Sequence, residues 1–79
     1  MGKTLTTREV IRRIEALGGR RIRVKGSHAT YEVVVRHADG SVRMAPAQVP
    51  IHGGDVPPGT LRSIQRQLGA VLGEGWLIR

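Results

Sequence analysis

The apolar residues of this 79-residue chain change their spacing at the glycine pair of positions 18 and 19. Before the pair, Val10, Ile14 and Leu17 recur at three- and four-residue intervals, which is the period of an amphipathic helix. After it, aliphatic residues alternate with polar ones, which is the period of a strand. The chain must therefore combine helix and sheet, and its length allows one domain over residues 1–79.

The first helix has a clear start signal. Thr6 and Glu9 have the spacing of a capping box, in which each side chain binds the other residue's backbone N–H. Leu5 and Val10 have the spacing of a hydrophobic staple around it. We predict a helix over 7–17, ended by the glycine pair.

Two strands are predicted after this helix, over 20–25 and 29–36. In the first, alternation places Ile22 and Val24 toward the core and three cations on the opposite face: Arg21, Arg23 and Lys25. In the second, alternation places three side chains on one face: Tyr31, Val33 and Val35. Gly26-Ser27 between the two strands is typical of a turn.

The second half of the chain predicts a hairpin, a loop and a helix. Asp39-Gly40 is a hairpin signal leading into a short strand over 41–45, which Pro46 should end. The proline- and glycine-rich stretch from 46 to 59 has no period and is predicted as a loop. Thr60 then opens a helix over 60–68, or to 72 if Gly69 lies inside it, and 73–79 form a tail.

These elements predict an α+β fold. Neither helix can bury its apolar stripe alone, so both should cover one face of a three-stranded antiparallel sheet. The result is a two-layer α-β-β-β-α sandwich that resembles a double-stranded RNA-binding domain.

The charge of the chain points to an anionic partner. Lys and Arg number 13 against 6 Asp and Glu, a net charge of +7, which is typical of small nucleic-acid-binding domains. The chain has no cysteine, which excludes disulfides and thiolate metal sites and suits a cytoplasmic protein. Its apolar runs are far shorter than the ~20 residues of a membrane span.

The densest positive charge precedes a possible catalytic residue. Arg20, Arg21, Arg23 and Lys25 lead into the turn Gly26-Ser27-His28. In an extended strand Arg21 and Lys25 stand about 13 Å apart, a span that suits consecutive phosphates. Gly26 leaves room for a ribose-phosphate, and the Gly26 and Ser27 amides can donate to it. An ordinary solvated sheet face is the alternative.

Four motifs, in order after a helix and a basic strand, give the chain a family resemblance from about residue 6 to 69. It resembles the HicA family of mRNA-cleaving toxins in Arg23-x-Lys25-Gly26-Ser27-His28, His37-x-Asp39-Gly40, Val49-Pro50-x-His52-Gly53 and Pro58-Gly59-Thr60-Leu61-Arg62-Ser63-Ile64. The resemblance implies a ribonuclease whose essential residue is His28. It also implies a HicB-type antitoxin that covers the active face of the toxin.

The chemistry can be considered apart from the resemblance. RNA carries its own nucleophile, the 2′-hydroxyl, so one imidazole that titrates near neutrality can serve as general base or acid. Arg23 and Lys25 can stabilise phosphate charge. We therefore expect metal-independent transesterification with no cofactor, because the three histidines have no metal-ligand spacing and the carboxylates are scattered.

Other residues keep two interpretations at this point. Arg62 and Arg66 either add phosphate contacts or form a solvated helix face, and Trp76 either packs the tail or stacks on a base. His52 is a possible second proton donor, whereas His37 is more typical of a loop. The partners expected are mRNA and the antitoxin, without DNA contact by the toxin alone. A non-catalytic RNA-binding module, or a protein that docks an acidic partner, are the alternatives.

Overall fold

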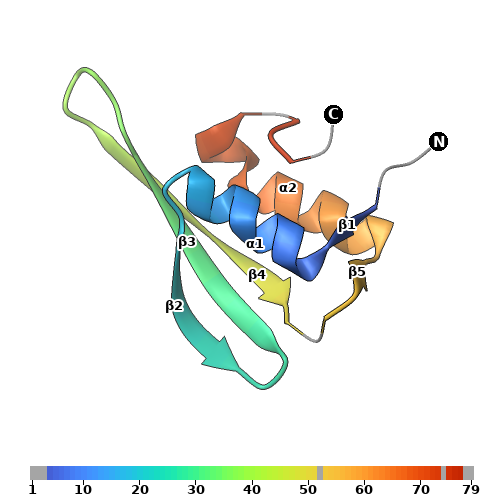
Figure 1. Ribbon diagram of the computed structural model, residues 1–79. Coiled ribbons are helices and arrows are strands. Elements are labelled where there is room, and N and C mark those ends of the chain that lie inside the picture. Colours follow the sequence, from blue (N-terminus) through green and yellow to red (C-terminus); the bar gives the residue numbers. More distant parts are fainter. Residues whose placement is uncertain (1–3, 52, 74, 78–79) are drawn as a thin grey trace.

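A computed structural model describes residues 4–51, 53–73 and 75–77 of the chain. Its elements follow in the order β1 (Leu5–Thr6), α1 (Thr7–Ala16), β2 (Arg20–Lys25), β3 (His28–Arg36), β4 (Val42–Pro50), β5 (Asp55–Val56) and α2 (Pro58–Leu72). The strands β2, β3 and β4 form an antiparallel sheet in that order (Figure 1). The predicted α+β class and the three-stranded sheet are confirmed.

The capping box that the sequence predicts is present at the start of α1. The Thr6 N–H donates to Glu9 Oε1 at 2.9 Å, and the Glu9 N–H donates to Thr6 Oγ1 at 3.1 Å. The first of these bonds is the main reason why the pKa of the exposed Glu9 carboxyl is lowered. Leu5 also pairs with Val56, so β1 and β5 form a two-stranded sheet that the sequence did not suggest.

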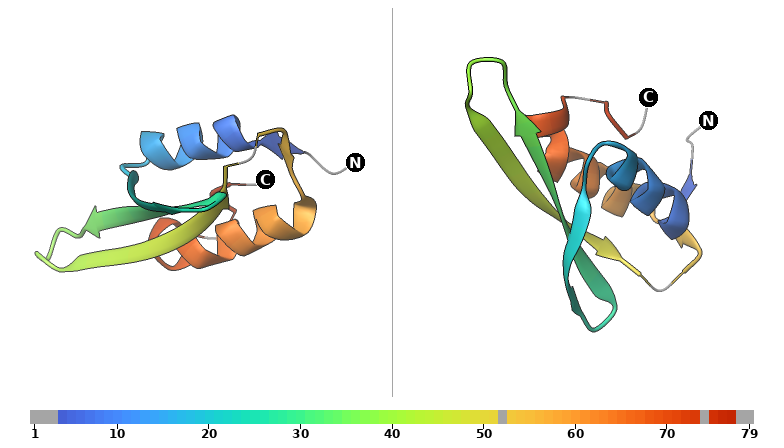
Figure 2. Two further views of the ribbon diagram at one scale, coloured as in Figure 1. Left: turned by 90° about the horizontal axis from the view of Figure 1, so that it is seen from below. Right: turned by 60° about the vertical axis from the view of Figure 1, so that its left-hand side comes forward.

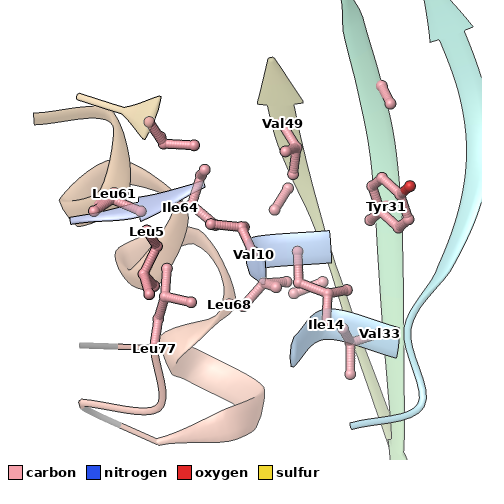
Figure 3. Packing of buried hydrophobic residues seen from close by; sticks show 14 residues of the cluster. Leu5, Val10, Ile14, Tyr31, Val33, Val49, Leu61, Ile64, Leu68 and Leu77 are labelled. Atoms are coloured by element: carbon pink, nitrogen blue, oxygen red, sulfur yellow. The ribbon is translucent and has the colours of Figure 1, made fainter. Parts of the chain in front are cut away.

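One face of the large sheet carries its buried side chains. Tyr31 and Val33 point to this face, with Val35 partly buried beside them as predicted. They form one apolar cluster with buried residues of both helices (Figure 3). The helix residues of the cluster are Val10, Ile14, Leu61, Ile64 and Leu68.

The strand β4 is longer than predicted and passes through two prolines. The Gln48 N–H donates to Gln67 Oε1 of α2 rather than to β3. Pro46 and Pro50 lie two residues on either side of Gln48, so their nitrogens point to the same outer edge. Neither proline therefore removes a hydrogen bond between the strands, and the prediction that Pro46 ends the strand is wrong.

The second helix starts two residues earlier than predicted. Pro57 occupies the N-cap position and Pro58 begins α2, so the predicted cap, Thr60, lies inside the helix. Proline suits this first turn because its missing N–H would have no partner there. Gly69 also lies inside α2, which settles the predicted end at position 72.

Candidate functional site

A two-residue turn places His28 at one end of the sheet. Lys25 and His28 pair directly across β2 and β3, and Gly26-Ser27 joins them. Gly26 has a φ of +59°, a conformation that glycine adopts without strain. The Ser27 carbonyl accepts from the Ile51 N–H at 2.8 Å, so the turn is also held to the end of β4.

A bulge in β2 sorts the cations between the two faces of the sheet. Arg21 pairs with Tyr31 but Arg23 pairs with Thr30, so Ile22 is one residue too many for the ladder. Directly opposite residues share a face, and Tyr31 is buried. Arg21 therefore lies on the helix-covered side, while Arg23 lies on the other, which we call the open face.

The surroundings of Tyr31 agree with this placement. Burial raises the pKa of the Tyr31 hydroxyl and the charge of Glu15 raises it further, whereas the positive charge of Arg21 lowers it. Glu15 belongs to α1, and both charges act on the hydroxyl of this one buried side chain. The prediction that Arg21, Arg23 and Lys25 share one face is wrong.

The predicted burial of β2 is also wrong. Ile22 and Val24 are exposed to 46% and 47%, although alternation placed both in the core. Every residue of β2 is exposed, so this strand is an open edge of the sheet. Val24 pairs with the buried Ala29 and therefore faces the helix-covered side as predicted, but its edge position leaves it exposed. The bulge at Ile22 reverses the faces of the residues before it, including Arg21, and the sequence carries no clear signal of this.

Five side chains line a hollow of about 430 Å³ on the open face: Arg23, Lys25, His28, Thr30 and Gln48. His28 is exposed, so a ligand in the hollow can reach its imidazole. Its Nδ1 lies 3.5 Å from Ser27 Oγ, at the outer limit of a hydrogen bond. Arg20 lies opposite Glu32 on the same face, beyond Arg23.

Thr30 and Gln48 are residues of the hollow that the sequence analysis missed. They pair directly across β3 and β4, next to the pair His28 and Pro50. The backbone of Gln48 is held by Gln67, whose Nε2 donates to Ser63 Oγ at 3.1 Å. The available signal was the alternation of Pro46, Gln48 and Pro50 with the apolar residues Ala45, Ala47 and Val49, and it was missed because prolines were interpreted as strand ends.

A second hollow lies elsewhere, between α2 and the tail. It measures about 640 Å³ and is lined by Arg62, Gln65, Arg66, Gly69, Ala70 and Gly75. It is larger than the hollow at His28 and shares no lining residue with it. The structure thus separates Arg62 and Arg66 from the predicted phosphate row.

Comparison with known protein families identifies the chain. Residues 7–70 match the model of a family described as the HicA toxin of bacterial toxin-antitoxin pairs. The chain belongs to this family. Searches of curated proteins and of solved structures found no match.

The match shows that the protein is a toxin with an antitoxin partner, as the resemblance implied. The matched residues include the whole hollow at His28 and exclude the tail. No helix among the described residues is long and apolar enough to cross a membrane.

His37 is the other histidine among the described residues, and it lies far from His28. His37 begins the turn between β3 and β4, at the opposite end of β3 (Figure 1). His52 lies outside the described residues. Residues 4–51, 53–73 and 75–77 contain no group of three or more His, Asp or Glu side chains suited to a metal ion.

The tail packs against the core of the toxin. Leu77 is 1% exposed, and its carbonyl accepts from Arg13 Nη1 at 2.9 Å. Trp76 Nε1 donates to the Gln65 carbonyl at 2.8 Å. The packing interpretation of Trp76 is therefore the one that the structure supports.

Proposed function

We propose that the toxin is an endoribonuclease that cleaves mRNA without a metal ion, with His28 as its general acid or base. One observation carries the proposal: in a toxin of this family, an exposed histidine and two cations line a single hollow. Because mRNA is the substrate, the toxin acts in the cytoplasm.

Each side chain of the hollow has a distinct role in the proposed reaction. His28 takes the proton of a ribose 2′-hydroxyl, whose oxygen attacks the adjacent phosphorus. The bond to the 5′-oxygen of the next nucleotide breaks, and that oxygen takes a proton from water. The products are a 2′,3′-cyclic phosphate and a 5′-hydroxyl.

Arg23 and Lys25 stabilise the negative charge that grows on the phosphate oxygens. They face the same side of the sheet as His28, and Lys25 is its direct cross-strand partner. Arg20 extends this positive row along the open face, and the Gly26 and Ser27 amides are further donors at the turn. Arg62 and Arg66 contact phosphates of the same RNA away from the reacting bond.

Thr30 and Gln48 complete the floor of the hollow with neutral polar groups. A hydroxyl and a carboxamide both donate and accept hydrogen bonds, which suits a ribose or a base edge. We therefore assign them to nucleotide binding rather than to proton transfer. A HicB-type antitoxin inhibits the enzyme by covering this surface.

The test is cleavage of a single-stranded RNA in EDTA by the wild type and by His28→Ala. General acid–base catalysis contributes roughly 10²–10⁴-fold, so His28→Ala should lower the rate by that factor. His37→Ala is the matched control, because His37 is another exposed histidine at a turn of the same sheet. It should cleave like the wild type.

Substrate and product identify the mechanism. An RNA with a 2′-O-methyl group at the cleaved position should resist the enzyme, and the fragments of normal RNA should end in a cyclic phosphate. RNA binding without cleavage would support a non-catalytic RNA-binding module instead. Equal rates for the wild type and His28→Ala would overturn the role of His28.

A further inference from the structure

The open face carries exposed apolar side chains at the end away from His28. Val34 pairs with Met44, and Val42 pairs with Arg36. The exposures of Val34, Val42 and Met44 are 37%, 51% and 59%. We call these three residues the apolar end of the open face.

The apolar end lies on the same face as the hollow, with the pair Glu32 and Pro46 between them. Alternate residues of β3 and β4 share a face, so Val34 lies on the same side as Thr30, and Met44 on the same side as Gln48. Val34 lies six positions after His28 along β3, a distance of about 20 Å. A partner protein of ordinary size can therefore span both regions, because a stable interface covers ~800 Å² on each side.

The chemistry of the apolar end favours protein over RNA. RNA is bound through phosphates, ribose hydroxyls and bases that stack on aromatic or arginine planes. Valine and methionine offer none of these contacts. Methionine is enriched in protein interfaces, and exposed apolar groups beside polar ones mark such interfaces.

The toxin family supplies the partner that this surface needs. A toxin of a toxin–antitoxin pair has an antitoxin, and the toxin's net charge of +7 favours an acidic one. Arg36 lies beside Val42 at the end away from the hollow. Arg20, opposite Glu32, lies between the apolar end and the hollow, so a cation lies on each side of the apolar residues.

We propose that the antitoxin anchors on Val34, Val42 and Met44 and reaches from there over the His28 hollow. The inference that this contact blocks catalysis rests on the function proposed above. The inference that the contact exists does not depend on that function. The anchor provides affinity through apolar burial, whereas the part over the hollow excludes RNA. The toxin would then have an antitoxin contact that its substrate does not use.

The test uses the double variant Val42→Thr/Met44→Gln, with the product of the neighbouring gene as the antitoxin. Both changes keep the approximate size and the charge of the side chains. The control is Leu17→Gln/Val24→Thr, which alters two aliphatic residues of similar exposure, 45% and 47%, away from the apolar end. Calorimetry gives the dissociation constant of each complex, RNA cleavage gives activity, and thermal unfolding checks the fold.

We expect the anchor variant to bind the antitoxin between about 10-fold and 100-fold more weakly. Its cleavage rate should stay within twofold of the wild type, and the control should match the wild type in both assays. If the wild type cleaves no RNA, the proposed function fails, while the binding comparison still tests the anchor.

Four results would overturn the anchor. Equal affinity of the anchor variant and the wild type would place the antitoxin contact elsewhere on the toxin. A neighbouring gene product that does not bind the wild type would refute the proposed partner. Parallel loss of cleavage in a correctly folded anchor variant would assign the apolar end to RNA. Wild-type dimers that this variant dissociates would assign it to a second copy of the chain.

Discussion

The two turns of the large sheet each carry a histidine, but they differ in the residues that surround it. The turn between β2 and β3 is tied to the end of β4, and it sets His28 beside two cations in a hollow. The turn between β3 and β4 projects from the body of the molecule and also carries a histidine, His37 (Figure 2). A histidine in a turn therefore does not by itself indicate a catalytic site. Its chemical role depends on the residues that cross-strand pairing places beside it.

The prediction with the largest expected effect compares alanine substitutions of the glycines in the two turns. Gly26 and Gly40 have φ angles of +59° and +90°, and a Cβ on either would meet no atom within 4 Å. Alanine at each position should destabilise the fold by a similar amount, about 1–2 kcal/mol, because each must hold a left-handed conformation. Only Gly26→Ala should also slow RNA cleavage, by roughly 10- to 100-fold, because a small displacement of His28 has a large effect.

Thermal unfolding and cleavage rates measured below the melting transition separate the two effects. Similar melting temperatures with a cleavage defect in Gly26→Ala alone would agree with the contrast. Cleavage defects of the same size in both variants would mean that overall stability, rather than the position of His28, limits activity.

The cations provide a smaller test, in the salt dependence of RNA binding. Arg20, Arg23 and Lys25 lie on the open face, and these three cations should contribute about −2 to the slope of log K against log salt on single strands. Arg23→Gln should reduce that slope by about 0.7. Arg21→Gln is the matched control, because the bulge places Arg21 on the other face.

This comparison can be made with an RNA that carries 2′-O-methyl groups, so that binding is measured without cleavage. An equal change of slope for Arg21→Gln and Arg23→Gln would restore the row of four cations that the sequence predicts, which would contribute about −3 to the slope. The proposed contacts of Arg62 and Arg66 add to the wild-type slope, and Arg62→Gln should reduce it by about 0.7.

The local signals of this chain were predictable, whereas the pairing between strands was not. The capping box of Thr6 and Glu9 depends on residues three apart, so the sequence reveals it directly. The bulge at Ile22 depends on how β2 aligns with β3, which no residue of β2 specifies. His28 could be predicted as a site residue from its own turn motif. The alternation around Gln48 indicates a strand, but only the pairing of β3 with β4 shows that Thr30 and Gln48 lie beside His28.

The smallest predicted effect is a loss of local stability at acidic pH, which should occur at one of the two turns and not at the other. In the turn between β3 and β4, the Asp39 carboxylate accepts from the Ser41 hydroxyl at 2.6 Å and from the Ser41 N–H at 2.9 Å. These bonds lower the pKa of Asp39 below its ordinary value. Their contribution to stability is therefore complete above the pKa of the unfolded chain, about 3.9, and is lost as the pH falls through the lower folded value.

Amide hydrogen exchange at several pH values, corrected for the intrinsic pH dependence of exchange, measures this effect for each turn separately. Between about pH 5 and pH 3 the Ser41 amide should lose protection before the Ile51 amide, which donates to a backbone carbonyl at the other turn. Asp39→Asn should remove most of the pH dependence at Ser41 and leave Ile51 unchanged. Simultaneous loss of protection at both amides would show that the sheet opens as one unit, and the two turns would then differ in chemistry but not in local stability.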